Sequence, residues 1–156
     1  MKPATADEYT LYCFAQSGNA YKPALMLEFA GANWSPRFVD YFNGETSTPA
    51  YRAINAMGEV PLLEHRGKRF SQSGVILDYL ASTLGEFGPD GEDERREILR
   101  WLLFDNHKLT SYTATYRFLR AFVANPDPDW LARLRALRGW KHPYDLMPGH
   151  PRRGVA

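Results

Sequence analysis

Short apolar stretches separated by turn-forming residues fill the first half of the chain. Thr10 to Phe14 is an apolar, β-prone stretch that ends at Gln16-Ser17-Gly18, which predicts a strand followed by a turn. Residues 19–30 are mostly helix formers and are apolar on more than one side, so we expect a largely buried helix that Gly31 ends. Polar and apolar residues alternate over 37–42, and this alternation predicts a second strand.

A short helix, a hairpin and a longer helix are expected next. Thr48 is a good N-cap and Pro49 suits the first helical position, while Arg66-Gly67 suits a tight turn between two strands. Ser73 begins a stretch whose apolar residues recur at helical spacing up to Gly85. The predicted elements are a helix over 48–57, strands over 60–65 and 68–70, and a helix over 73–84.

The order β-α-β-α-β-β-α over residues 8–85 predicts an α/β domain of thioredoxin-like arrangement. Residues 86–92 have the composition of a linker, and residues 93–124 carry a long helical pattern. Another helix is expected after Pro128, with Gly139 as its stop. We therefore expect a second, all-α domain over residues 93–150.

Composition and charge give no reason to expect nucleic acid or a membrane as partner. The chain has 156 residues, and its 19 Lys and Arg nearly balance its 18 Asp and Glu. No run approaches the roughly 20 apolar residues of a membrane span. Cys13 is the single cysteine, so no intramolecular disulfide can form, and we expect a soluble protein of the reducing cytoplasm.

Two sites along the predicted sheet have the chemistry to hold a ligand. Pro61 opens a strand after Val60, and a cis bond there would turn the main-chain groups of Val60 toward an extended, peptide-like ligand. Gln72 and Ser73 stand where unpaired N–H groups at a helix start favour a carboxylate. An ordinary strand-opening proline and a simple helix cap are the alternatives.

The residues around these two sites resemble the glutathione S-transferase family. Asn55 to Leu63 is similar to the family motif N-P-x-G-x-V-P-x-L, with Ala56 in place of the first proline. Phe70 to Ser73, with Ile76, resembles the glutamate- or glutamine-serine motif that precedes the third helix of the family. Residues 139–145 resemble the tail of many bacterial members.

The resemblance implies a binding site for glutathione as co-substrate, without a metal. Val60 would hydrogen-bond the cysteinyl backbone, Pro61 would be the cis proline, and Gln72 and Ser73 would hold the γ-glutamyl end. Ser17 would point its hydroxyl at the sulfur, as in serine-type members of the family, with Asn19 as the alternative. Residues 44–47 stand where the glycyl carboxylate is usually bound, but they offer no basic side chain. Tyr112 and Tyr116 are candidates for an acceptor pocket, although core packing is the alternative.

A hydroxyl beside the sulfur has a simple physical task. A free thiol with a pKa of about 8.5 is mostly protonated at pH 7, and each unit of lowering requires about 1.4 kcal/mol in favour of the thiolate. Capping of a helix is the alternative role for Ser17. Cys13 lacks a C-x-x-C partner and is expected to pack inside the first strand. The histidines, at positions 65, 107, 142 and 150, show no paired metal-ligand spacing.

Members of the family usually carry five or more helices in their second domain, so this helical domain is expected to be shortened internally, near residues 126–130. We expect a glutathione transferase that acts on an apolar electrophile and forms a homodimer. A non-catalytic glutathione-binding module is the alternative. Thiol-disulfide or dehalogenase-like chemistry is a weaker third possibility.

Overall fold

The computed structural model describes residues 8–137, and these fall into two compact units divided between Leu103 and Phe104. The predicted tail over residues 139–145 lies outside the described residues. The first unit contains a sheet with its helices, and the second is helical.

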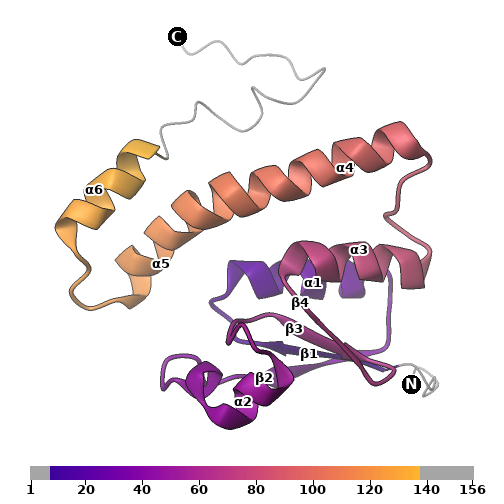
Figure 1. Ribbon diagram of the computed structural model, residues 1–156, viewed down its shortest axis with the longest axis horizontal. Coiled ribbons are helices and arrows are strands. Elements are labelled where there is room, and N and C mark those ends of the chain that lie inside the picture. Colours follow the sequence, from indigo (N-terminus) through magenta and orange to yellow (C-terminus); the bar gives the residue numbers. More distant parts are fainter. Residues whose placement is uncertain (1–7, 138–156) are drawn as a thin grey trace. The chain divides into compact units, whose positions relative to one another are not determined.

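A four-stranded sheet forms the centre of the first unit (Figure 1). Its strand order is β2-β1-β3-β4, with β1 parallel to β2 and β3 antiparallel to both β1 and β4. The strands are β1 (Tyr9–Cys13), β2 (Trp34–Phe38), β3 (Leu62–His65) and β4 (Lys68–Ser71). The β-α-β-α-β-β-α order of the thioredoxin-like prediction is therefore confirmed.

Helices cover both faces of this sheet, but unequally. Figure 1 shows α1 (Gly18–Phe29) and α3 (Ser73–Leu84) on one face and α2 (Pro49–Ile54) on the other. Alternate residues along each strand face opposite sides of the sheet, so two separate clusters form. The core under α1 and α3 consists of Tyr9, Leu11, Leu27, Leu63, Ile76 and Leu80. The smaller cluster under α2 consists of Tyr12, Val39, Tyr51 and Leu62.

The second predicted strand is present, but its predicted bounds of 37–42 are wrong, because β2 runs from Trp34 to Phe38. Pro36 is tolerated in β2 because this strand lies at the edge of the sheet. After Val39 the backbone bonds locally instead of to the sheet, with the Tyr41 N–H donating to the Val39 carbonyl at 2.8 Å. The apparent alternation over 37–42 therefore reflects an aromatic-containing turn.

The remaining predicted elements of the first unit are present with small shifts. Thr48 is the N-cap of α2, but this helix ends at Ile54 and not at 57, because Asn55 takes an extended conformation. Arg66 and Gly67 both have positive φ angles, 49° and 71°, as a two-residue hairpin turn requires. The N-cap of α3 is Gln72, with Ser73 as the first helical residue.

The long helical pattern also forms, but with an unpredicted change of geometry. The consecutive segments are α4 (Glu92–Phe104), the π-helix η2 (Asp105–Ala114) and α5 (Thr115–Phe122). In η2 the bonds span five residues, as when the Thr115 N–H donates to the Thr110 carbonyl. The Ser111 hydroxyl supports this wider turn by donating to the Asn106 carbonyl at 3.0 Å. The helix expected after Pro128 is α6 (Pro128–Leu137).

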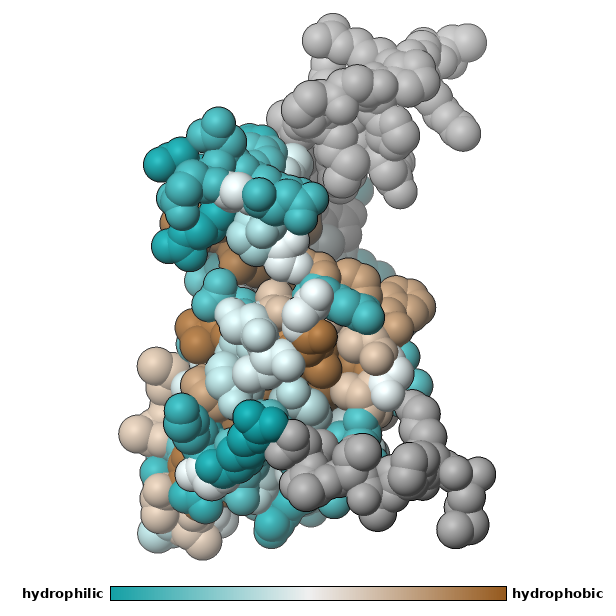
Figure 2. Space-filling view, turned by 90° about the vertical axis from the view of Figure 1, so that its right-hand side faces the viewer, coloured by the Kyte–Doolittle hydropathy of each residue, from teal (hydrophilic) through white to brown (hydrophobic). Residues whose placement is uncertain are grey.

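Apolar side chains reach the surface at several places. Figure 2 shows hydrophobic residues interrupting the hydrophilic surface on the face that it presents. In the first unit, Phe29, Leu99 and Leu103 are each more than half exposed. Among the described residues, no helix is long and apolar enough to cross a membrane.

Truncating a buried leucine of the sheet is expected to destabilise the protein far more than truncating an exposed one. Leu63 is fully buried between α1 and α3, so Leu63→Ala should lower the free energy of unfolding by about 2–5 kcal/mol. The matched control Leu99→Ala, at a position 52% exposed, should cost less than about 1 kcal/mol. Urea denaturation measures both, and equal costs would contradict the assigned core.

Candidate active site

Strand register brings the ends of three strands to one edge of the sheet. Leu62, the first residue of β3, pairs with Tyr12 near the end of β1 and with Ser71 at the end of β4. Because β3 runs opposite to both neighbours, its start lies beside their ends. The residues that follow β1 and β4 and those that precede β3 therefore meet at this edge, which we call the ligand edge. It gathers the predicted residues Ser17, Val60, Pro61, Gln72 and Ser73.

Ser17 lies at the ligand edge as the N-cap of α1. Its Oγ accepts a hydrogen bond from the Ala20 N–H at 3.2 Å, and its own N–H donates to the Phe14 carbonyl at 3.0 Å. The capping role is therefore present. Accepting from Ala20 uses a lone pair and leaves the hydroxyl hydrogen able to donate to a ligand. The start of a 12-residue helix also favours a negative charge nearby.

The Val60–Pro61 peptide bond is cis, as the sequence pattern suggests. Pro61 is buried, and Val60 packs partly buried against the cluster under α2. Val60 also precedes Leu62, the first residue of β3 that pairs in the sheet. Its main-chain groups thus stand where an added extended segment would continue the ladder.

Asn55 and Tyr51 fix the loop that leads to the cis bond. The Asn55 side-chain amide and the Tyr51 hydroxyl both donate to the Glu59 carbonyl, at 2.7 and 2.9 Å. The Asn55 side-chain oxygen in turn accepts from the Met57 N–H at 3.2 Å. Burial raises the pKa of Tyr51 to about 12, against a smaller lowering by Asn55, so its hydroxyl remains a donor at neutral pH.

The backbone conformation of this loop favours glycine at position 58, where φ is +63°. An added Cβ would lie 2.6 Å from the guanidinium of Arg52, so that flexible side chain would have to shift. That guanidinium donates to the Ala56 carbonyl at 2.7 Å. Arg52, which lies in α2, therefore also holds this loop in place.

Gln72 and Ser73 lie at the start of α3. Gln72 has φ 69° and ψ 118°, a strained conformation for a residue other than glycine, and such strain concentrates at functional sites. Its amide donates to Glu59 Oε2 at 2.9 Å and contacts Met57 Sδ at 3.1 Å. No side chain caps α3. Within the part of the chain that the structure describes, the Ser73 hydroxyl makes no hydrogen bond.

An aromatic cluster at the ligand edge was not predicted from the sequence. Phe14 stacks on Tyr41 with ring centroids 4.6 Å apart and meets Phe42 edge-on at 5.7 Å. Phe14 is buried, whereas Tyr41 and Phe42 are 37% and 51% exposed. The turn that positions Ser17 is thus braced by the loop after β2. The polarity pattern of residues 37–42 predicts a strand, and it gives no signal that Tyr41 and Phe42 pack against Phe14.

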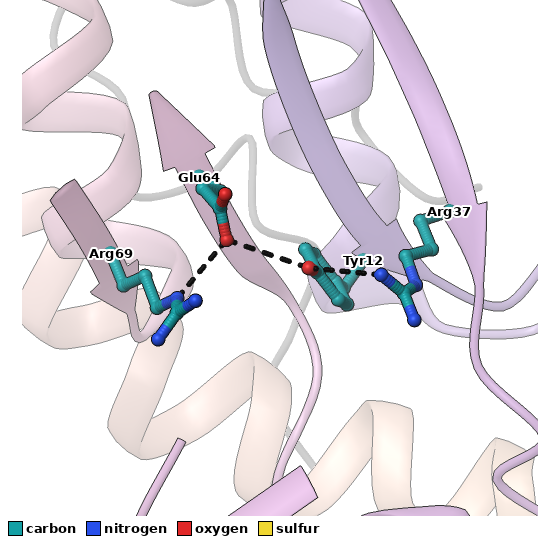
Figure 3. Close-up of polar contacts among 4 residues, drawn as sticks. All are labelled: Tyr12, Arg37, Glu64 and Arg69. Carbon is teal, nitrogen blue, oxygen red and sulfur yellow. Dashed lines mark hydrogen bonds and ion pairs between the residues drawn. The ribbon is translucent and has the colours of Figure 1, made fainter. Parts of the chain in front are cut away.

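A polar chain crosses the sheet face that carries α2 (Figure 3). Arg37 donates to the Tyr12 hydroxyl at 3.3 Å, Tyr12 donates to Glu64 at 3.5 Å, and Arg69 pairs with Glu64 at 3.0 Å. Each of the four residues comes from a different strand. These contacts connect the Glu64 carboxylate to side chains of the neighbouring strands. A different acidic side chain, that of Glu59, contacts Gln72.

The other candidate residues occupy varied places. Asn19 is in the first turn of α1, next to Ser17. Cys13 is the last residue of β1 and packs against the main core, as expected. Tyr112 lies in η2 and Tyr116 in α5, both in the second unit, so their role in an acceptor pocket stays a prediction.

The described residues contain no group of three or more metal-ligating side chains that could hold a metal ion. Of the four histidines, His65 is buried at the end of β3, where its Nδ1 lies 2.9 Å from the Tyr79 hydroxyl. His142 and His150 lie outside the described residues.

Removing the Asn55 side chain should cost much more than removing an exposed amide. Asn55 is buried, and Asn55→Ala leaves the Glu59 carbonyl with one donor fewer, so this variant should lower the free energy of unfolding by about 1–3 kcal/mol. Asn43→Ala, which removes an exposed contact to Asp40, should change it by about 0.5 kcal/mol or less. Urea denaturation of both variants provides the test, and similar costs would refute the anchoring role.

Cys13 should be a poor nucleophile while the protein is folded. Burial raises the pKa of its thiol, so less thiolate is present at a given pH than in the unfolded chain. Alkylation by iodoacetamide at pH 8 should be at least about 5-fold slower in the folded protein than in concentrated urea, and should accelerate as pH rises. Mass spectrometry follows the reaction. Equal rates in both states would contradict the protection expected from the partial burial of Cys13.

Comparison with known proteins places this geometry in a family. The model of the glutathione S-transferase N-terminal domain matches residues 7–82. Glutathione S-transferase 1 of Dianthus caryophyllus is 30% identical over 154 residues, covering 96% of this chain and 70% of that protein. Protein URE2 of Candida maltosa is 30% identical over 137 residues, covering 82% of this chain.

Solved structures agree. A glutathione S-transferase from Pseudomonas fluorescens Pf-5 has a TM-score of 0.77 and 31% identity, covering 83% of this chain and 66% of that one. Ure2p in complex with glutathione has a TM-score of 0.72 at 24% identity, covering 83% and 62%, a likeness of fold alone. This chain spans less than half the length of several curated relatives, 42% in the case of Protein URE2. With its fold, its ligand edge and its match to the Dianthus protein, the chain belongs to the glutathione S-transferase family.

Proposed function

We propose that the protein binds glutathione at the ligand edge and conjugates the thiol of glutathione to an apolar electrophile. The register of β3 against β1 and β4 carries this proposal, because it groups Ser17, the Val60–Pro61 bond and the start of α3 at one place. The three groups match the three chemical needs of the ligand: a donor to sulfur, a main-chain partner, and a site for charged termini.

Each part of glutathione has a complementary group. The cysteinyl backbone extends the sheet by pairing with the main chain of Val60. The γ-glutamyl carboxylate accepts from the Ser73 hydroxyl and from the first N–H groups of α3, which no side chain caps. The partner of the glycyl carboxylate remains unassigned, since residues 44–47 include no basic side chain and the Glu45 carboxylate already accepts from the Asp40 N–H.

Ser17 then acts on the sulfur. Its hydroxyl hydrogen bonds to the thiolate, and the start of α1 adds a favourable field, so the thiol loses its proton to solvent more readily. The thiolate attacks an electrophilic carbon of the acceptor, a carbon–sulfur bond forms, and with an aryl halide the halide leaves with its bonding electron pair. Proximity and a larger thiolate fraction supply the rate enhancement.

Three substitutions separate the capping role of Ser17 from its catalytic role. Ser17→Asp keeps a side chain that caps α1 but lacks a hydroxyl and repels a thiolate, so kcat/KM for an aryl halide should fall about 10-fold or more while stability is kept. Ser17→Ala should lose activity and also about 1 kcal/mol of unfolding free energy. Ser17→Thr should retain both. Conjugation is followed by absorbance and stability by urea denaturation.

The same series has an outcome that rejects the role of Ser17. If Ser17→Asp and Ser17→Ala conjugate at the native rate, another group activates the thiol. The ultraviolet absorbance of the bound thiolate, titrated with pH, should show a higher thiol pKa in both variants than in the native protein.

A non-catalytic glutathione-binding module is the alternative. Calorimetry that detects glutathione binding, without any conjugation of an aryl halide, would select this alternative. The acceptor pocket at Tyr112 and Tyr116, the homodimer and the cytoplasmic location remain predictions. Partial burial raises the pKa of the Cys13 thiol, and this speaks against thiol-disulfide chemistry through this residue.

A further inference from the structure

We propose that Glu59 is a ligand-binding residue whose carboxylate receives the free ammonium group of the γ-glutamyl end. This inference rests on the proposed function, because it assigns one more contact at the same site. It arises from an unexpected pairing, in which the Gln72 amide donates to Glu59 Oε2 at 2.9 Å.

The γ-glutamyl end of glutathione carries both a carboxylate and an ammonium on one carbon atom. The start of α3 offers several donors, namely its first N–H groups and the Ser73 hydroxyl, and no negative charge, so it suits the carboxylate. Gln72 is neutral and cannot balance the ammonium charge. An acidic group within reach of Gln72 is therefore needed, and Glu59 stands there.

Glu59 is also held in a defined place although its side chain is exposed. Its carbonyl accepts from Asn55 and from Tyr51, and the cis Val60–Pro61 bond follows directly. Its carboxylate accepts from Gln72, which lies at the start of α3. The carboxylate thus bridges the loop before β3 and the start of α3, the two segments between which the γ-glutamyl end would lie.

The hydrogen bond from Gln72 leaves the Glu59 carboxylate able to accept further hydrogen bonds. An ionised carboxylate offers about four lone-pair sites, and Gln72 uses one of them on Oε2. An ammonium group can therefore bind Glu59 while Gln72 stays in place. The negative charge of Glu59 would face the ammonium, and the donors of α3 would face the carboxylate. The site thus matches both charges of a free α-amino acid group.

The test pairs a variant with a ligand that lacks the same interaction. Glutathione and its deamino analogue, glutaryl-cysteinylglycine, are titrated by calorimetry into the native protein and into Glu59→Gln. The variant should bind glutathione about 5- to 10-fold more weakly and should bind the analogue within about 2-fold of native, because only glutathione carries the ammonium. Glu86→Gln, the same charge change at an exposed position beyond the far end of α3, is the matched control and should bind both ligands as the native protein does.

Each other result has a definite meaning. If Glu59→Gln binds glutathione as tightly as native, or loses affinity equally for both ligands, the inference is wrong while the glutathione site survives. If the native protein binds neither ligand, the proposed function fails and this inference fails with it. Circular dichroism and urea denaturation should show Glu59→Gln with the native fold and an unchanged urea midpoint, because the Glu59 side chain is exposed.

Discussion

The antiparallel pairing of β3 with β1 and β4 is the constraint on which the rest of the site depends. A sheet register can change only by whole residues, and a shift by one residue would turn every buried side chain of β3 to the other face. Leu62 and Leu63 lie in different hydrophobic clusters, so each face independently opposes such a shift. The same packing that stabilises the sheet therefore fixes the start of β3 next to the turn at Ser17 and the start of α3.

Polar contacts refine what the register brings together. The amide of the buried Asn55 and the hydroxyl of the buried Tyr51 both donate to one carbonyl, that of Glu59, and a carbonyl with two such donors resists displacement. Gln72 joins this loop to α3 through Glu59. The ligand edge is thus preorganised in its main chain, which limits the entropy that a bound ligand must overcome.

The features that the sequence predicted well depend on local chemistry. Thr48 as an N-cap, the turn at Arg66-Gly67 and the stop of α3 at Gly85 each follow from short-range geometry. The bounds of the second strand were predicted too late in the chain, because residues 37–42 alternate in polarity for another reason. Tyr41 and Phe42 pack around Phe14, a contact between segments far apart in the chain. The π-helix η2 carries no sequence signal that distinguishes it from an α-helix.

The sequence by itself determined the order of the elements, the cis-proline motif and the residue types available to a ligand, because these depend on neighbours along the chain. Only the tertiary structure decided which of those residues meet. Glu59 and Gln72 are separated by two strands in the sequence, and only the hairpin between β3 and β4 brings them within 2.9 Å. Long-range pairing of this kind is set by the packing of whole faces, which no single residue encodes.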